Sequence, residues 1–386
     1  MDSLRSIAIL MVLEGHFITH SLQTQYRDDS NPIYATWKFT RGLTAPLFLF
    51  ISGLIFTFLL LKNPIQSYLN PRVKKGFKRG LLLIFLGYLL QLNLYTFFFE
   101  DKKLCTDLFQ IFHILQCIGT SLILVLFIYL INLYWLKLPF AFVCIILGSL
   151  IFLTTPTLQA GNYKALHRCI ENILIVSKNT ELKTSVFPLF PWTGFVFMGA
   201  GLGSLVFKYR EQFYQLKFLA ILFCIGLILD RFYYNFLTGL WLINPFSSLQ
   251  NFSFIYEFAR LGQIMMVFSC FVYLHQHQNK FKKYVKWIPW NRGLFLKIGQ
   301  NTLSIFVLHV VLLYQGFLGW KINELIQNKL SPWPAILGAL LFISLFVFWV
   351  HYLDFIKQIP AKTYKKLYVS YLKLKRAKYR QRSFGV

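Results

Sequence analysis

Long runs of apolar residues dominate the chain, and short polar stretches separate them. Most of these runs reach the roughly 20 residues that a helix needs to cross a bilayer. The alternation predicts ten membrane-spanning helices, near residues 4–22, 43–61, 80–98, 108–132, 138–153, 187–207, 217–235, 252–274, 298–318 and 333–352. The fifth of them is the weakest. We therefore expect an all-α, polytopic membrane bundle that forms a single domain over residues 1–352.

The composition agrees with a membrane protein. Of the 386 residues, 56% are hydrophobic, 19% are aromatic and only 14% are charged. A soluble domain carries about 25% charged residues. The net charge of +26 could suggest nucleic acid as a partner, but the placement of the charges along the chain does not support that interpretation.

The basic residues gather in three clusters without any acidic residue: residues 62–79 and 280–297 hold six each, and residues 357–382 hold ten. With ten spans, all three clusters fall on one side of the membrane. Because cytoplasmic loops are enriched in Lys and Arg, we expect both termini in the cytoplasm. Residues 353–386 would form a basic cytoplasmic tail beside anionic membrane lipids rather than nucleic acid. The expected location is the bacterial cytoplasmic membrane.

Ionisable side chains interrupt the first predicted helix, in the stretch LEGHFITH. Such groups are costly in hydrocarbon and often mark a function. At 100° per residue, His16 and His20 share one face with Arg5, which lies roughly 16 Å before His16 along the helix. Glu14 points elsewhere. We take His16, His20 and Glu14 as candidate catalytic residues.

Other predicted helices carry similar polar residues. His113 lies one turn into the fourth helix, Glu257 and Arg260 face each other one turn into the eighth, and His309 is near the middle of the ninth. In a bundle these residues would line a polar cavity in the outer half of the membrane. Such a cavity can be an active site, or a path for protons or ions. Cys105 and Cys169 fall in predicted outer loops, so a disulfide between them remains open.

Common catalytic motifs are missing from the sequence. It has no P-loop, no GxSxG and no GxGxxG, which argues against ATP-driven and serine-hydrolase chemistry. The His16-to-His20 spacing suits zinc, but the Glu of HExxH and a third ligand are lacking, so we expect no metal. A histidine is well suited to deprotonate a hydroxyl or an amine, or to accept an acyl group itself.

Four stretches, in order along the chain, resemble a known family: DSLRSIAILMVLEGH at 2–16, LTAPLFLFISG at 43–53, FPLFPW at 187–192, and IGQNTLSIFVLH at 298–309. They are similar to the transmembrane acyltransferase superfamily, and within it to the heparan-α-glucosaminide N-acetyltransferase-like catalytic domain. Two features depart from the family pattern. Ser6 replaces the usual Gly, and no histidine occurs between residues 21 and 112, where the lysosomal members have one that is associated with catalysis. The resemblance therefore puts the catalytic role on His16, with His20 as its rival.

The resemblance implies an acyltransferase that takes acetyl from cytoplasmic acetyl-CoA and passes it to a sugar or glycolipid acceptor on the far side of the membrane. Arg5, Arg292 or the basic stretch 72–79, interpreted as a loop, would hold the CoA phosphates. His16 would activate the acceptor as a base or carry the acetyl group. The expected substrate-binding residues are Arg5, His113, Glu257, Arg260, His309 and Asn301.

A second interpretation uses the same buried histidines in a transporter or proton-coupled permease. Binding of CoA would favour the enzyme, and a requirement for a pH gradient would favour the transporter. The sequence leaves open the acceptor, N- or O-acetylation, direct transfer or an acetyl-histidine intermediate, and the oligomeric state.

Overall fold

The structure, a computed structural model, describes residues 2–92, 111–161, 168–176, 185–231, 254–277, 292–314 and 322–353. Over these ranges it is helical and contains no β-strand beyond one isolated bridge, between Leu22 and Leu330. The first half contains α1 (Asp2–Ser21), α2 (Pro32–Gly42), α3 (Thr44–Leu61), α4 (Pro71–Gln91), α7 (Ile114–Ile131) and α8 (Phe140–Ala160). After α8 come α9 (Arg168–Leu174), α10 (Leu189–Lys208), α11 (Leu216–Arg231), α13 (Phe254–Gln276), α15 (Arg292–Gln300), α16 (Thr302–Tyr314), α17 (Ile322–Ile326) and a C-terminal helix, Pro332–Leu353.

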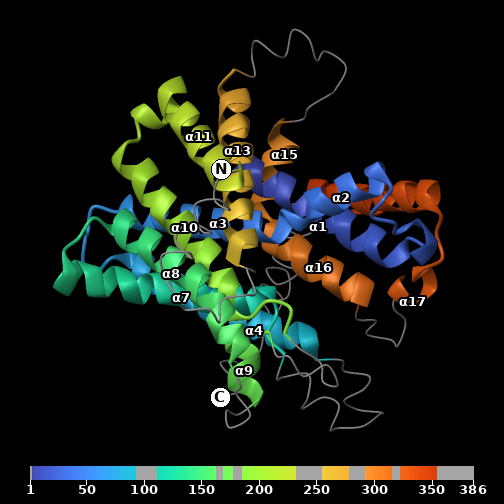
Figure 1. Cartoon of the computed structure of the whole chain (residues 1–386), viewed down its shortest axis with the longest axis horizontal. Coiled ribbons are helices and arrows are strands. Elements are labelled where there is room, and N and C mark those ends of the chain that lie inside the picture. Colours follow the sequence, from blue (N-terminus) through green and yellow to red (C-terminus); the bar gives the residue numbers. More distant parts are fainter. Residues whose placement is uncertain are drawn as a thin grey trace, which may run out of the picture.

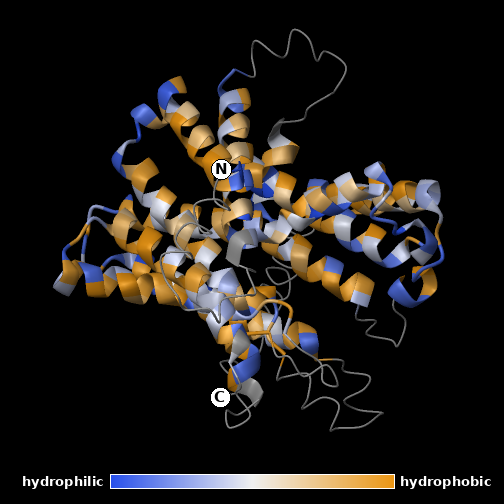
Figure 2. Ribbon diagram, viewed as in Figure 1, coloured by the Kyte–Doolittle hydropathy of each residue, from blue (hydrophilic) through white to orange (hydrophobic). Residues whose placement is uncertain are grey.

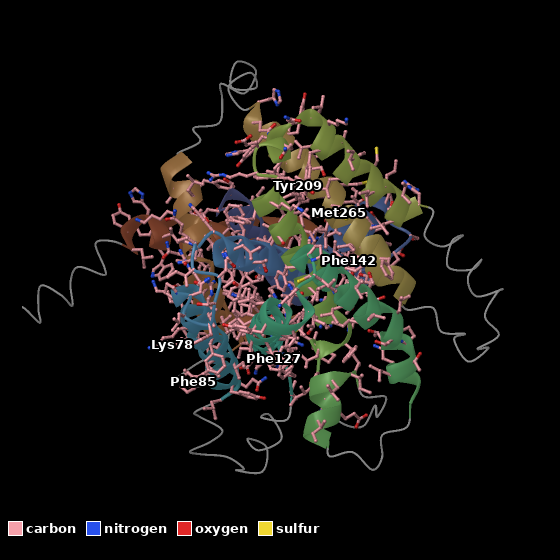
Figure 3. All side chains as sticks on the ribbon, turned by 90° about the vertical axis from the view of Figure 1, so that its left-hand side faces the viewer. Lys78, Phe85, Phe127, Phe142, Tyr209 and Met265 are labelled. Carbon is pink, nitrogen blue, oxygen red and sulfur yellow. The ribbon has the colours of Figure 1, made fainter. Side chains whose placement is uncertain are left out.

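The helices confirm an all-α polytopic membrane bundle. Each of the ten predicted segments contains a helix, and in the described part of the chain six helices are long and apolar enough to cross a membrane, or seven if α15 and α16 form one bent span. In Figure 2 the hydrophobic colour runs along most of the helices. Phe85, Phe127 and Phe142, on three different helices, are 63%, 60% and 54% exposed and lie on the outside of the bundle (Figure 3). Such a surface suits contact with lipid.

Local sequence signals explain where several helices begin. Pro46 lies in the first turn of α3, where a missing backbone N–H costs nothing. The side chain of Asn31 caps α2 by accepting from the Ile33 backbone N–H at 2.9 Å. Asn70 caps α4 in the same way, by accepting from the Arg72 backbone N–H at 2.9 Å. The basic stretch 72–79 is therefore the start of α4 and not a loop, which corrects the expectation from the sequence.

Glycines let α3 and α10 approach each other at backbone distance. A Cβ added to Gly199 would collide with the carbonyl of Phe50, and one added to Gly203 would collide with the carbonyl of Leu54. A Cβ on Gly53, from the α3 side, would collide with the carbonyl of Val196. Small residues permit such contacts between membrane helices. Helices α3 and α10 form the centre of the larger core. Helices α7 and α8 pack against α10, and α1 packs against α3 (Figure 1).

Hydrogen bonds tie both ends of α1 to the last third of the chain. At its start, Ser6 Oγ donates to the Phe295 carbonyl at 2.5 Å, and Gln300 Nε2 donates to an Asp2 carboxylate oxygen at 3.2 Å. At its end, the Leu330 backbone N–H donates to the Ser21 carbonyl at 2.8 Å. Both ends of α1 are thus bonded to the last third of the chain, and Phe17 of α1 packs against Phe342 of the C-terminal helix with 5.5 Å between the ring centroids.

Candidate active site

Three aromatic side chains form a hydrogen-bonded chain between α1 and α16. His16 and His20 share a face of α1, as the helical spacing predicts, and the Tyr314 hydroxyl lies between them. The distance from Tyr314 Oη to His16 Nδ1 is 2.5 Å, and that to His20 Nε2 is 2.9 Å. Sequence reasoning missed Tyr314, because a tyrosine near the end of an apolar segment looks like an interfacial anchor.

His309 completes the cluster from the middle of α16. Its ring centroid lies 5.3 Å from that of His16, and its side chain is fully buried. No described side chain hydrogen-bonds either of its ring nitrogens. Phe306, one turn earlier, packs edge-on against His309 with 4.8 Å between the ring centroids. A buried imidazole with free polar atoms beside a second imidazole is suited to meet a polar group of a ligand.

Glu14 is on a different side of α1 and does not join the histidine chain. Its carboxylate accepts a hydrogen bond from Trp37 Nε1, at 2.5 Å, so it links α1 to α2. Arg41, near the end of α2, donates from Nε to the Gly15 carbonyl at 3.3 Å. Its guanidinium also lies 5.9 Å from the Trp37 ring centroid. These contacts fix the middle of α1 against α2.

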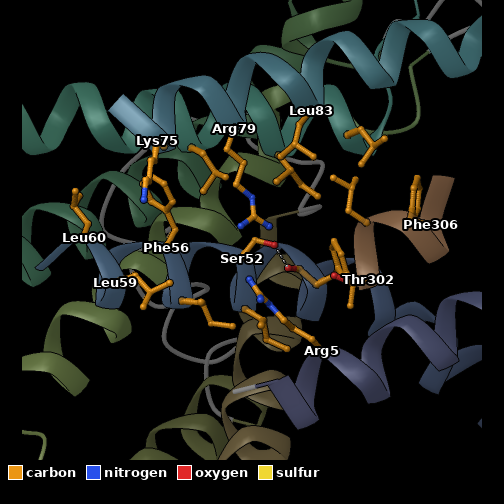
Figure 4. Close-up of a pocket in the computed structure, with 18 of the residues that line it drawn as sticks. Arg5, Ser52, Phe56, Leu59, Leu60, Lys75, Arg79, Leu83, Thr302 and Phe306 are labelled. Carbon is orange, nitrogen blue, oxygen red and sulfur yellow. Dashed lines mark hydrogen bonds between the residues drawn. The ribbon is translucent and has the colours of Figure 1, made fainter. Parts of the chain in front are cut away.

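A cavity of about 270 Å³ lies beside Phe306, the residue that packs against His309. Cationic side chains from α1 and α4 line it, and in Figure 4 the guanidinium groups of Arg5 and Arg79 point toward each other from opposite walls. Phe306 and Thr302, from α16, also line it. The complete set of cationic lining residues is Arg5, Arg72, Lys75 and Arg79. Most other lining side chains are apolar, from α1, α3, α4, α7 and α16.

The cavity therefore has two chemically different regions. One region carries positive charge, with Arg5 also 3.8 Å from an Asp2 carboxylate oxygen. The other reaches Phe306, whose ring contacts His309 and separates the cavity from the histidine cluster by one side chain. A long ligand with phosphates at one end and a reactive group at the other matches this arrangement.

Glu257 and Arg260, which face each other in the predicted helix, form no ion pair. The part of the chain that the structure describes has no salt bridge between them. Arg260 Nη1 donates instead to the Phe39 carbonyl at 3.2 Å and to Gln263 Oε1 at 3.0 Å. Its guanidinium also lies 4.7 Å from the ring centroids of both Phe39 and Tyr256. The arginine thus fastens α13 to α2, and neither residue joins the histidine chain.

The remaining candidate residues lie at helix ends or outside the described residues. His113 is not one turn into a helix; it is the residue before α7, and its side chain makes no capping bond. Asn301 Nδ2 donates to the Lys297 carbonyl at 2.8 Å, where α15 and α16 meet at a bend of 71°. Cys105 and the side chains of Arg292 and Cys169 lie outside the described residues, and so does the open question of a disulfide. Within the described ranges, no group of three His, Cys, Asp or Glu side chains could hold a metal ion.

Comparison with known proteins gives one match. Residues 1–226 match the family model described as heparan-alpha-glucosaminide N-acetyltransferase, catalytic. No curated protein and no solved structure matches the chain. The matched region includes His16, His20 and the basic start of α4 but ends within α11, so His309 and Tyr314 lie beyond it.

Proposed function

Because the chain belongs to the family of the heparan-alpha-glucosaminide N-acetyltransferase catalytic domain, we propose that it moves an acetyl group from cytoplasmic acetyl-CoA to a sugar hydroxyl or amine on the far side of the membrane. The family and the helix bundle make it an integral membrane protein of an acetyltransferase family. Our proposal adds three points to this: that acetyl-CoA is the donor, that transfer runs from the cytoplasm to the far side of the membrane, and that a sugar is the acceptor.

One observation carries this proposal: the cavity is lined by four cations and also by Phe306, whose ring packs against the buried His309. CoA is a long molecule with phosphates at one end and a thioester at the other. Arg5, Arg72, Lys75 and Arg79 would hold its phosphates by charge-assisted hydrogen bonds. The apolar walls suit the pantetheine arm, which would lead the thioester past Phe306 toward His309 and His16.

The cations also bear on the orientation in the membrane. All four belong to the start of α1 or the start of α4, and the sequence predicts that both lie on the cytoplasmic side because of the positive charge there. Cytoplasmic acetyl-CoA could then enter at the charged region without crossing the bilayer. His16 and His20 would lie nearer the opposite side, where the acceptor arrives.

In this mechanism His16 is the base that takes a proton from the acceptor, or the nucleophile that carries the acetyl group. His309, packed against Phe306 and His16, would hold the thioester carbonyl by a hydrogen bond from one of its ring nitrogens. Glu14, bonded to Trp37, would act by holding α1 in place rather than by touching the reacting atoms. Asn301 would support the bend at which α16 begins.

The test is binding of acetyl-CoA to the purified full-length protein in nanodiscs, followed by transfer to amino and neutral sugars. We expect saturable binding that weakens at least tenfold in Arg79→Gln and persists in His16→Ala, while His16→Ala loses transfer. Lys208→Gln is the matched control, because Lys208 ends α10 and does not line the cavity. Absence of acetyl-CoA binding in the wild type would overturn the proposal and favour a transporter.

A further inference from the structure

Tyr314 joins two titratable side chains that would otherwise be separate. Its hydroxyl lies 2.5 Å from His16 Nδ1 and 2.9 Å from His20 Nε2. A phenolic hydroxyl has one proton to donate and lone pairs to accept with. It can therefore donate to one imidazole and accept from the other, and exchanging these two roles moves a proton at each hydrogen bond.

The two histidines differ in their surroundings. His16 packs against the fully buried His309, whereas His20 is one turn further along α1, at the second-to-last residue of the helix. Positive charge on His16 would lie beside His309 and Arg41, and positive charge on His20 would lie near Arg41 and Arg27. Arg27 is already held by the Leu22 carbonyl and by Asn328 Oδ1, both at 2.5 Å. Glu14 is the nearby carboxylate on α1, and it is bonded to Trp37.

We propose that His16, Tyr314 and His20 form a reversible proton relay, in which Tyr314 passes the charge that forms on His16 to His20 during the reaction. This inference rests on the proposed transfer. It gives separate roles to two histidines that the sequence left as rivals: His16 meets the acceptor, and His20 and Tyr314 are positioning residues that act through His16.

The protons balance as follows when His16 acts as the base. The acceptor N–H or O–H bond breaks as its nitrogen or oxygen bonds to the acetyl carbon, and the acceptor proton goes to Nε2 of His16. The proton on Nδ1 of His16 moves to Tyr314 Oη, and the hydroxyl proton of Tyr314 moves to Nε2 of His20. The two relay protons return as the thioester C–S bond breaks: the proton on Nε2 of His20 moves to Tyr314 Oη, and the hydroxyl proton of Tyr314 moves to Nδ1 of His16. His16 is then an imidazolium, and the CoA thiolate takes the proton on its Nε2, which restores the starting state.

Substitution of Tyr314 by Phe removes the bridging oxygen and keeps the ring. We expect Tyr314→Phe and His20→Gln each to lower kcat about 10- to 100-fold, the size expected for hydrogen bonds to a charged group, with the KM for acetyl-CoA unchanged. The double variant is expected to be no slower than the slower single variant, because residues that act as a unit are not additive. Tyr129→Phe is the control, since the hydroxyl of Tyr129, on α7, likewise donates a hydrogen bond, to Gln66 Oε1 at 2.7 Å.

If Tyr314 only supported the structure, its removal would not change how many protons move in the transition state. The experiment is to measure kcat in mixtures of H₂O and D₂O, and we expect kcat to vary with the fraction of D₂O along a curve in the wild type and along a straight line in Tyr314→Phe. An unchanged kcat in Tyr314→Phe, or single-variant losses that multiply in the double variant, would overturn the relay while acetyl transfer by the wild type still stood.

A second readout does not need enzymatic activity. Histidine ¹⁵N signals of the full chain in nanodiscs, assigned with His16→Gln and His20→Gln, report the protonation of each ring as the pH is lowered. With the relay, the His16 and His20 signals change together in the wild type and separately in Tyr314→Phe. Separate titration in the wild type would overturn the relay, whereas failure of the proposed function would appear as lack of transfer with the two signals still coupled.

Discussion

The two regions beside Phe306 differ in how their polar groups are held. The region on the cavity side gathers four cations from the starts of α1 and α4, around an open volume. The region beyond Phe306 holds its imidazoles by ring contacts and by short hydrogen bonds to one hydroxyl. Charge acts over a distance and tolerates changes of geometry, whereas proton transfer does not. The affinity for acetyl-CoA should therefore depend on the combined charge of several cations, and the rate of transfer on the exact positions of single histidine and tyrosine atoms.

The largest expected effect is at His16. His16→Ala should lower kcat about 100- to 10,000-fold, which is the usual contribution of a general acid or base. Binding of acetyl-CoA should change less than twofold, because His16 does not line the cavity. Single-turnover transfer and equilibrium binding, measured on the same preparation, separate the two quantities. Retention of transfer would show that the chemistry is elsewhere.

Removal of one cation from the cavity should have a smaller effect than His16→Ala, and it should change the KM for acetyl-CoA rather than kcat. Arg79→Gln should raise the KM for acetyl-CoA about 10- to 100-fold, because a hydrogen bond to a charged group contributes about 1.5–3 kcal/mol. The kcat at saturation should stay near that of the wild type. Steady-state kinetics with acetyl-CoA and with acetyl-pantetheine, which lacks the nucleotide phosphates, checks the assignment. An equal rise of KM for both donors would contradict it.

The sequence predicts the parts of this site that depend on one helix and misses those that depend on two. The shared face of His16 and His20 follows from the rotation per residue in α1. Tyr314 is 294 residues from His20, and no local pattern connects them. The i,i+3 spacing of Glu257 and Arg260 correctly brings them to one side of α13, but the Phe39 carbonyl and Gln263 compete for the guanidinium.

The helices were easier to predict than their ends. Each of the ten apolar segments contains a helix, and in the described part of the chain six or seven of these helices are long and apolar enough to cross a membrane. The bounds depend on caps and on contacts between helices. Asn70 begins α4 before the basic stretch, and α7 begins only after His113. These shifts matter for the site, because a helical start of α4 places Arg72, Lys75 and Arg79 one after another along the cavity.

A moderate effect is expected at the contact that supports α1 from the side. Trp37→Phe keeps an aromatic ring and removes the donor to Glu14. Loss of one hydrogen bond to a carboxylate should lower the thermal stability of the protein and reduce kcat about 2- to 10-fold. Glu14→Gln can still accept from Trp37 and is the matched variant, with a smaller expected loss. Similar losses in both would instead assign the carboxylate charge a role in the reaction.

The smallest expected effect is that of salt, and it tests whether the cationic cavity and the histidine cluster act independently. Raising the ionic strength from about 0.1 M to 1 M shortens the Debye length from about 10 Å to about 3 Å. The KM for acetyl-CoA should rise a few-fold in the wild type, because four cations act together on the phosphates. The kcat should not change, since the histidines interact at hydrogen-bond distance and next to buried side chains. The KM of Arg79→Gln should respond less to salt than that of the wild type. A kcat that falls with salt would mean that the two regions are not independent, and that charge in the cavity also sets the protonation of His16.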